Sequence, residues 1–439
     1  MAVTVETLDK LERRITLSLA ADALKNEVDA RLKKLARTVK ADGFRPGKVP
    51  MTVVTQRYGY SVQYEVVNDQ VGEAFQKAAT EAQLRVAGTP RISEKQDGVA
   101  EEGKILFDAT FEVYPQVVVG DLSTAEIERV TADVNEAAID RTVEILRKQR
   151  RTFAQRPQNE AAADGDRATI DFEGKIDGVP FDGGKAEAYQ FLLGEGQMLE
   201  AFEKAVRGMK TGDSKTFPLK FPEDYHGKDV AGKEADFLVT VKKLEAQNLP
   251  EVNEAFVESL GLTESTVEAL RADIKKNLER DVKFRVAGRN KSAAMEALLK
   301  VTEFDVPVSL VEAETQRLVE NARADLKARG IKDADKAPIP SEMFTPQAER
   351  RVRLGLIVGE LVKANNLQAK PEQLQAHIQE LAQSYEQPQQ VVAWYMTDRQ
   401  RMAEVEAVVI EANVADFILS KAKVTDKTVG FEELMGQQG

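Results

Sequence analysis

The sequence of 439 residues contains no cysteine and only two histidines, His226 and His377. Without cysteine, disulfide bonds, catalytic thiolates and thiolate metal sites are excluded. Two histidines argue against a histidine-rich metal site and against a Ser-His-Asp triad. We therefore do not expect a protease or a nuclease, because the triad or metal ligands that such enzymes need are missing.

Long apolar runs are also missing. No stretch approaches the roughly eighteen apolar residues that a membrane helix needs. Residues 1–14 alternate in charge and lack the apolar segment of a secretory signal. These features predict a soluble cytoplasmic protein.

What the chain does have is length, charge and residues that favour helices. It is too long for one compact core, and about three domains are expected. Apolar residues make up 42% of the chain, which is enough to form such cores. We predict a multidomain α+β fold, with an α+β N-terminal domain, an antiparallel β domain with one short helix, and a mainly α-helical C-terminal domain.

One short stretch stands out, Gly43-Phe44-Arg45-Pro46-Gly47-Lys48-Val49-Pro50. Its glycines and prolines interrupt a helix and predict a turn. Residues 31–48 contain seven cations and one acid, a charge of +6, whereas the whole chain carries −12 and the remainder therefore −18. A cationic tip on an acidic body is typical of docking to a polyanionic surface. Charge alone leaves an ordinary solvated loop equally open.

The residues around this turn predict a helical hairpin on a small sheet. Alternation over residues 2–19 predicts two strands, and a helix is expected to open at Ala21 with Asp22 as its N-cap. A second helix is expected from Val54 to Ala79, and a strand pair at 90–94 and 104–113. The turn would then lie at the tip of the hairpin, in an N-terminal domain of residues 1–115.

The rest of the chain divides into segments that differ in glycine content and in the period of their apolar residues. Residues 116–160 are expected to be a helical connector, with its helix at 134–151. Residues 161–246 contain frequent glycines and short apolar alternations, which predict an antiparallel β domain with one helix at 198–206. Residues 247–439 are expected to be nearly all helix, with long helices at about 263–300, 346–366 and 398–421.

The β domain contains motifs of an enzyme. They run from Asp171-Phe172-Glu173-Gly174 through Phe181-Asp182 and Gly208-Met209-Lys210-Thr211-Gly212-Asp213 to Tyr225. In this order and spacing, residues 165–244 resemble the FKBP-type peptidyl-prolyl isomerases. The resemblance implies rotation about X–Pro peptide bonds, with no cofactor and no metal.

Elementary chemistry is consistent with that reaction. Rotation about an amide crosses a barrier of about 18–20 kcal/mol because conjugation is lost. The twisted amide is less delocalised, so an apolar pocket poor in water can favour it over the planar form. A hundredfold to ten-thousandfold acceleration requires only about 3–5.5 kcal/mol, and needs no nucleophile or general base.

The resemblance assigns the residues of the isomerase pocket. Asp182 and Tyr225 would be its polar members, near the substrate imide and backbone. Phe172 stands where many relatives have Tyr, and Phe202 stands where many have Trp, which affects the expected binding of small-molecule inhibitors. His226 is interpreted as a turn residue. The full set is Phe172, Phe181, Asp182, Tyr189, Met198, Leu199, Phe202, Tyr225 and Phe237; the aromatic members could also be simply the core of a small β domain.

The order of domains resembles the bacterial trigger factor family over the whole chain. That resemblance implies a chaperone that docks on the large ribosomal subunit at the exit tunnel, with ribosomal RNA nearby, and shields nascent and unfolded polypeptides. Its helical domain would extend two arms. It also links the chain to protein transport, the cell cycle and cell division. The docking residues would be Gly43, Phe44, Arg45, Pro46, Gly47, Lys48 and Pro50.

Two other functions remain open at this point. A free cytosolic isomerase could use its flanking domains only to recruit substrates, although it would have no use for the cationic tip. A nucleic-acid binder could use the basic helix, although the overall charge of −12 and the lack of base-stacking aromatics around the basic patch beyond Phe44 argue against it. The long amphipathic helices also leave room for a homodimer away from the ribosome.

Overall fold

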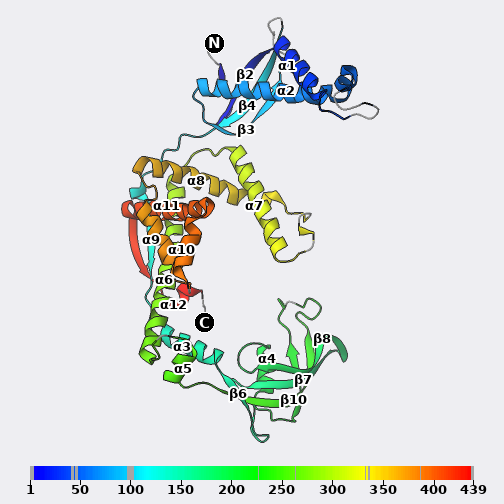
Figure 1. The fold of residues 1–439 in the computed structure, drawn as a ribbon. Helices are drawn as coiled ribbons and strands as arrows, with labels where there is room; N and C mark the ends of the chain where they lie inside the picture. The colour runs from blue at the N-terminus through cyan, green and yellow to red at the C-terminus, as the bar shows by residue number, and fades with distance from the viewer. Residues whose placement is uncertain are drawn as a thin grey trace. The chain divides into compact units, whose positions relative to one another are not determined.

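The computed structural model describes residues 4–40, 44, 48–95, 103–225, 227–262, 264–331, 333–334, 337–385 and 387–436. The chain forms two compact units. The first combines Met1–Val130 with Ala287–Lys427, and the second combines Thr131–Val286 with Thr428–Gly439. Figure 1 shows the elements of both units.

The N-terminal part of the first unit is a four-stranded antiparallel sheet with strand order β1-β2-β4-β3. The strands are β1 (Val5–Thr7), β2 (Glu12–Ala20), β3 (Val86–Glu94) and β4 (Lys104–Val113). Ile15 and Leu17 of β2 alternate with exposed residues and are buried against helix α2 (Met51–Glu81), through Val71 and Phe75. The alternation in the sequence therefore predicted this sheet correctly.

Helix α1 (Ala21–Leu35) packs along the first half of α2 and forms the predicted hairpin. Leu24 and Leu32 of α1 are buried against Val54, Val62 and Val66 of α2. The predicted N-cap was wrong. Ala20 occupies the cap position, and Asp22 lies in the first turn, where its charge favours the positive end of the helix dipole.

The second part of this unit is helical. Its elements are α7 (Val308–Ala328), the 3₁₀ helix η3 (Ser341–Met343), α8 (Thr345–Asn365), α9 (Pro371–Ala382), α10 (Pro388–Met396) and α11 (Arg399–Lys421), together with the end of α6 (Val267–Val301). The prolines that open α9 and α10 are tolerated there, because the first turn has no intrahelical partner for its N–H groups. Leu298, Ile357 and Ile418 are fully buried at the centre of the packed helices.

Residues 117–130 join this helical core. Leu122, in the 3₁₀ helix η1 (Leu122–Thr124), and Ile127 of β5 (Glu126–Thr131) are buried among α6, α8 and α11. Strand β5 pairs with β11 (Lys423–Thr428) near the end of the chain. Asn290 of α6 holds the backbone of Val130, accepting its N–H at 2.7 Å and donating to its carbonyl at 2.9 Å. The connector expected at 116–160 therefore contains strands that its sequence did not indicate.

The second unit contains a helical cluster. Helices α3 (Glu136–Gln149) and α5 (Glu254–Ser259) pack on the first half of α6 through Ile139, Phe256 and Leu270. The side chains of Asn135 and Asn253 cap α3 and α5 by accepting N–H groups of the first turn. Helix α12 (Phe431–Met435) also belongs to this unit.

A five-stranded antiparallel sheet completes the second unit. Strand β10 (Glu234–Asn248) pairs with β6 (Thr152–Gln155), β7 (Arg167–Ile176) and β9 (Ser214–Lys220), and β7 also pairs with β8 (Val179–Leu192). The predicted short helix is α4 (Glu200–Val206). Phe191, Phe202 and Val239 are buried between the sheet and α4. In the described parts of the chain, no helix is long and apolar enough to span a membrane.

Candidate functional site

The predicted pocket residues come from several elements of the β domain. Phe172 lies on β7, Phe237 on β10, and Phe181, Asp182 and Tyr189 on β8. Phe202 lies on α4, whereas Met198 and Leu199 precede it and Tyr225 lies in the connection between β9 and β10. The fold thus brings together residues that are up to 65 positions apart, from Phe172 to Phe237.

Phe237 stands at the centre of an aromatic cluster. Its ring centroid lies 5.6 Å from that of Phe202, 6.1 Å from that of Phe172 and 6.1 Å from that of Phe181. Phe172 also meets Tyr189 edge to face at 5.8 Å. These separations are those of favourable aromatic pairs, so the rings fix one another's orientation.

The exposed fraction of the side chains increases from the centre of the cluster to its border. Phe202 and Phe237 are buried, at 2% and 5% exposed, and serve as the floor. Phe172, Phe181, Met198, Leu199 and Tyr225 are partly buried and pack against that core. Tyr189 is exposed at 39%, and Asp182 is also exposed. The predicted set is therefore an aromatic floor with an accessible rim, rather than a fully buried core.

Two glycines make room for Phe181. A Cβ on Gly184 would lie 2.9 Å from Cζ of Phe181, and a Cβ on Gly174 would lie 2.6 Å from Cε1 of Phe237 and 3.0 Å from Cε1 of Phe181. The distances of 2.6 and 2.9 Å are shorter than a Cβ atom tolerates, so a larger residue at either position would displace a ring. The packing of the aromatic rings therefore leaves room only for glycine at positions 174 and 184.

The sequence analysis missed Phe221. Its ring lies 6.0 Å from Phe181, 6.2 Å from Phe237 and 4.9 Å from Tyr225, so it joins the predicted Tyr225 to the cluster. Phe221 is buried at 5% exposed. The Phe217-Pro-Leu-Lys-Phe221 spacing was the available signal, because alternate residues of a strand and its extension share one face.

Buried Glu203 was also missed. It is 5% exposed on α4 and accepts the backbone N–H of Gly194 at 2.9 Å and of Met198 at 3.3 Å. These bonds hold the turn between β8 and α4, and so place Met198 and Leu199 against the aromatic core. A buried carboxylate is tolerated here because backbone donors satisfy its oxygens.

Asp171 performs a similar task for Tyr189. Its carboxylate accepts the N–H of Ala188 at 2.8 Å and pairs with Lys242 at 2.9 Å. The bond from Ala188 and then the contact with Lys242 hold the pKa of Asp171 below its ordinary value. Ala188 adopts a positive φ of 51°, which the carboxylate stabilises, and this bend sets the direction of Tyr189.

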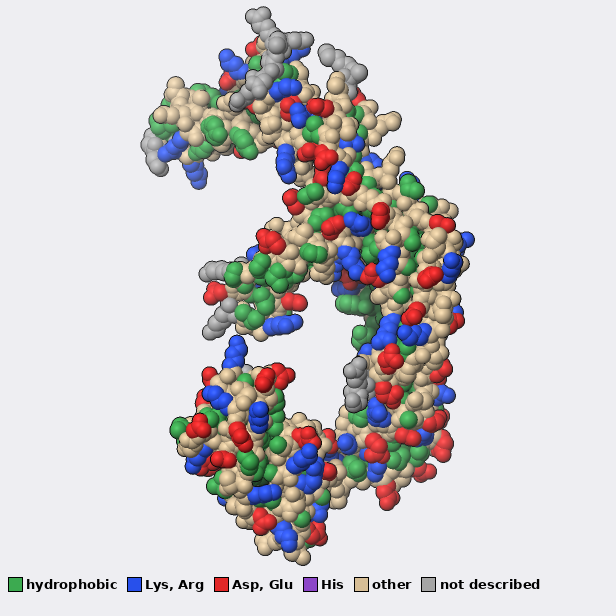
Figure 2. Space-filling view, turned by 180° about the vertical axis from the view of Figure 1, so that it is seen from behind, with side chains coloured by type: hydrophobic (Ala, Val, Ile, Leu, Met, Phe, Trp, Pro, Cys, Tyr) green, Lys and Arg blue, Asp and Glu red, His purple; other side chains and the backbone are tan. Residues whose placement is uncertain are grey.

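The docking tip is described in part. Phe44 is exposed at 41%, Lys48 is exposed, and Pro50 is an exposed residue in extended conformation at the start of α2. Gly43, Arg45, Pro46, Gly47 and also His226 lie outside the described residues. Figure 2 shows this end of the N-terminal domain with green and blue side chains and few red ones.

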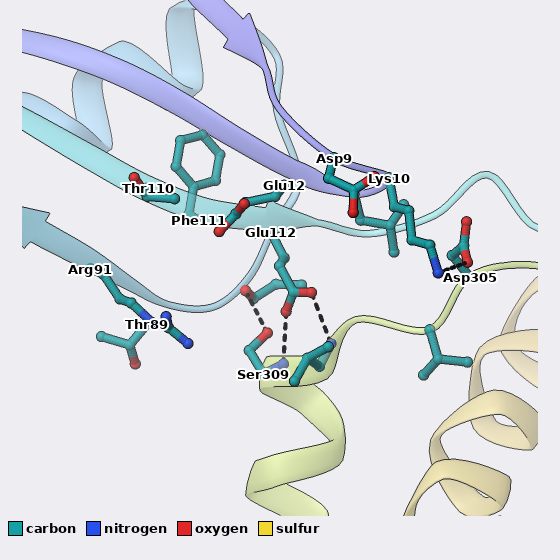
Figure 3. A pocket seen from close by; sticks show the side chains of 14 residues that line it. Asp9, Lys10, Glu12, Thr89, Arg91, Thr110, Phe111, Glu112, Asp305 and Ser309 are labelled. Atoms are coloured by element: carbon teal, nitrogen blue, oxygen red, sulfur yellow. Dashed lines mark hydrogen bonds and ion pairs between the residues drawn. The ribbon is translucent and has the colours of Figure 1, made fainter.

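A cavity of about 310 Å³ lies in the first unit, between the end of the N-terminal sheet and the start of α7 (Figure 3). Lys10, Arg91 and Glu112 line it from the sheet, and Asp305 and Ser309 line it from the helical part. Lys10 pairs with Asp305 at 3.2 Å. No group of His, Asp or Glu side chains in the described ranges is arranged to hold a metal ion.

Comparison with known proteins supplies the family. Residues 1–146 match the model of bacterial trigger factor protein, residues 266–420 match the model of its C-terminus, and residues 158–242 match FKBP-type peptidyl-prolyl cis-trans isomerase. The trigger factor of Leptothrix cholodnii is 74% identical over 99% of this chain and all of its own length. The trigger factor of Methylibium petroleiphilum is 72% identical over the same shares.

The chain belongs to the trigger factor family. Its middle part is an FKBP-type peptidyl-prolyl isomerase domain, and the chain is therefore a ribosome-associated chaperone with isomerase activity, as its sequence predicted. A solved structure described as "Promiscuous Substrate Recognition in Folding and Assembly Activities of the Trigger Factor Chaperone" is also similar, with 18% identity and a TM-score of 0.45 over 96% of this chain and all of the other.

Proposed function

We propose that the aromatic cluster around Phe237 is the site at which this trigger factor isomerises X–Pro bonds. The graded burial of the cluster carries this assignment, because Phe202 and Phe237 offer an apolar floor and Tyr189 borders an accessible rim. Such a surface binds the proline ring and withholds water from the twisting amide. Asp182 and Tyr225 are the polar groups proposed to meet the substrate backbone.

Isomerase turnover on a proline peptide tests this site. Phe181→Ala and Tyr225→Ala are expected to lower turnover, because both rings border the apolar floor on which the proline would bind. Neither ring lies at the centre of the cluster, so the domain is expected to keep its fold. Val179→Ala is a suitable control, since Val179 is an exposed residue, at 66%, on the same strand as Phe181. Unchanged turnover in both pocket variants would place the reaction elsewhere.

We further propose that the tip at 43–50 docks the chain on the large ribosomal subunit. Phe44 supplies an apolar anchor, and Arg45 and Lys48 supply charge toward protein and nearby ribosomal RNA. The exposure of Phe44, at 41%, supports this role, because an anchor must be accessible to its partner. Gly43, Pro46, Gly47 and Pro50 complete the proposed docking set.

Ribosome co-sedimentation at low and high salt tests the docking. The combined variant Phe44→Ala, Arg45→Ala and Lys48→Ala is expected to lose binding and to keep its fold. A matched control, Lys220→Ala with Lys228→Ala, also removes two positive charges, from exposed positions in the β domain. Normal co-sedimentation of the triple variant would reject the assignment.

The remaining functions follow from this division. Residues 1–115 would dock, 161–246 would isomerise, and 247–439 would hold nascent and unfolded polypeptides in the cytoplasm, joined by 116–160. Away from the ribosome we expect a homodimer, and sedimentation velocity over a concentration series checks it: a single monomeric species up to tens of micromolar would contradict it. Roles in protein transport, the cell cycle and cell division stay predictions.

A further inference from the structure

Helix α2 carries two strongly exposed tyrosines, Tyr60 and Tyr64. Tyr60 is 86% exposed and Tyr64 is 62% exposed, which are large fractions for aromatic side chains. They lie four residues apart, and so stand above one another on one side of the helix, about 6 Å apart along its axis. Two neighbouring exposed aromatic side chains on one helix face are more typical of a binding surface than of an ordinary solvated helix.

The same side of α2 is covered farther along the helix. Tyr60, Tyr64, Val67 and Val71 follow the spacing of one helix face. Val71 is fully buried against the N-terminal sheet, and Val67 packs partly against it. The first half of α2 extends past the sheet (Figure 1), so Tyr60 and Tyr64 occupy the part of this face that the sheet does not reach.

On their own face of α2, the tyrosines have a cation and no acid as helix neighbours. The residues three and four positions from Tyr60 and Tyr64 include Arg57 and no aspartate or glutamate, whereas Glu65, which directly follows Tyr64, lies on the side that faces α1. Residues 43–64 contain three cations, Arg45, Lys48 and Arg57, and no aspartate or glutamate, in a chain whose net charge is −12. Arg57 is exposed and lies one turn before Tyr60 on α2. Exposed tyrosines beside an arginine, with no acid on the same helix face, have the composition of a surface on which bases stack.

The position of the two tyrosines selects the partner. Tyr60 lies nine residues after Met51, the first residue of α2, and so about 14 Å along the helix from the end of the proposed docking tip. We propose that Tyr60 and Tyr64 form a stacking platform for unpaired bases of ribosomal RNA beside the docking site. This inference rests on the proposed docking and extends it along α2.

Binding to purified ribosomes tests the platform. Tyr60→Ala with Tyr64→Ala is expected to weaken ribosome binding at least tenfold, because each lost stacking partner removes a contact with a base. Tyr60→Phe with Tyr64→Phe keeps both rings and is expected to bind within twofold of the unchanged chain. Tyr385→Ala is the control for loss of an exposed tyrosine, since Tyr385 is 60% exposed on the helical part.

A photo-crosslink identifies the partner directly. With p-benzoylphenylalanine at position 60, the ribosome-bound chain is expected to give an adduct that ribonuclease removes. An adduct only to a ribosomal protein, a nascent chain or a second copy would overturn the inference, as would equal binding by the double alanine variant. If the Phe44, Arg45 and Lys48 variant binds normally, the docking itself fails. If it loses binding while the tyrosine variant does not, only the platform fails.

Discussion

The carboxylate of Glu112 accepts the backbone N–H of Ser309 at 2.7 Å and that of Val308 at 2.9 Å. Glu112 is the last but one residue of strand β4, and these two donors open helix α7, about 200 residues away in the chain. A side chain from another domain thus caps the helix, where the first N–H groups have no partner of their own and the dipole favours an anion. Figure 3 shows both bonds at the edge of the cavity.

Removing this cap is expected to loosen the start of α7. Glu112→Ala leaves two helix donors without a protein acceptor, a loss of about 1–2 kcal/mol. Hydrogen exchange of the Val308 and Ser309 amides is expected to become at least fivefold faster. Glu12→Ala is the control, because Glu12 lies opposite Glu112 in the β2–β4 pair and lines the same cavity. Equal protection in both variants would contradict the capping role.

The same contact is expected to depend on pH. Burial raises the pKa of Glu112, but the hydrogen bonds from Ser309 and Val308 outweigh it, so the pKa lies below its ordinary value of 4.5. A carboxylate with a depressed folded pKa stabilises above its ordinary pKa and loses that stabilisation as pH falls through the folded value. As the pH is lowered past about 4.5, the hydrogen-exchange protection of the Ser309 amide, corrected for the intrinsic exchange rate, is expected to decrease in the unchanged chain. It is not expected to decrease in Glu112→Ala.

A second carboxylate predicts acid sensitivity in the β domain. Hydrogen bonds from Arg167, at 2.9 Å, and Lys243, at 3.0 Å, lower the pKa of Glu245 from 4.5 to about 2. Its stabilisation is therefore complete above pH 4.5 and lost between 4.5 and 2. Solvent near both cations limits it to about 1–2 kcal/mol. In Glu245→Gln, the β domain is expected to be less stable at pH 7, and its free energy of unfolding is expected to depend less on pH between 4.5 and 2. An unchanged pH dependence would show that the contacts of Glu245 with Arg167 and Lys243 do not stabilise the fold.

Local patterns predicted much of this fold. The alternation of Ile15 and Leu17 and the stripe of Val54, Val62 and Val66 indicated the elements in which they lie, because one buried face leaves a period in the sequence. The family resemblance selected Phe172, Phe202 and Phe237, which do meet in one cluster. The aromatic types alone could equally have formed an ordinary core.

Long-range contacts were beyond such patterns. Strand β5 pairs with β11, about 300 residues later, and nothing local distinguishes its residues from a linker. Glu112 looks like any exposed acid at a strand end, and its partner is a backbone that only the tertiary fold brings near. Phe221 follows strand β9 and was not among the predicted pocket residues, although it joins Tyr225 to the aromatic cluster.

The glycine beside Phe181 allows a test of the pocket without removal of an aromatic ring. A Cβ at Gly184 would lie 2.9 Å from Phe181, and Gly184 has no positive φ, so Gly184→Ala acts by displacing the ring. Isomerase turnover is expected to fall several-fold while ribosome binding stays unchanged. Gly359→Ala is the matched control, since a Cβ at this position of α8 would meet open space. Alanine also favours a helix slightly more than glycine does. Full activity of Gly184→Ala would show that the position of Phe181 does not matter.

The pairing of Asn290 with strand β5 is expected to determine how firmly residues 117–130 hold to the helical core. Asn290 is 9% exposed and satisfies both the N–H and the carbonyl of Val130. Asn290→Ala leaves the N–H and the carbonyl of Val130 without this partner in a partly buried place, at a cost of about 1–3 kcal/mol. Thermal unfolding of the helical part should shift to a lower temperature. Asn365→Ala is the control, because Asn365 donates only to the carbonyl of Leu361 within its own helix. Equal shifts in both variants would mean that β5 is held by the burial of Leu122 and Ile127 alone.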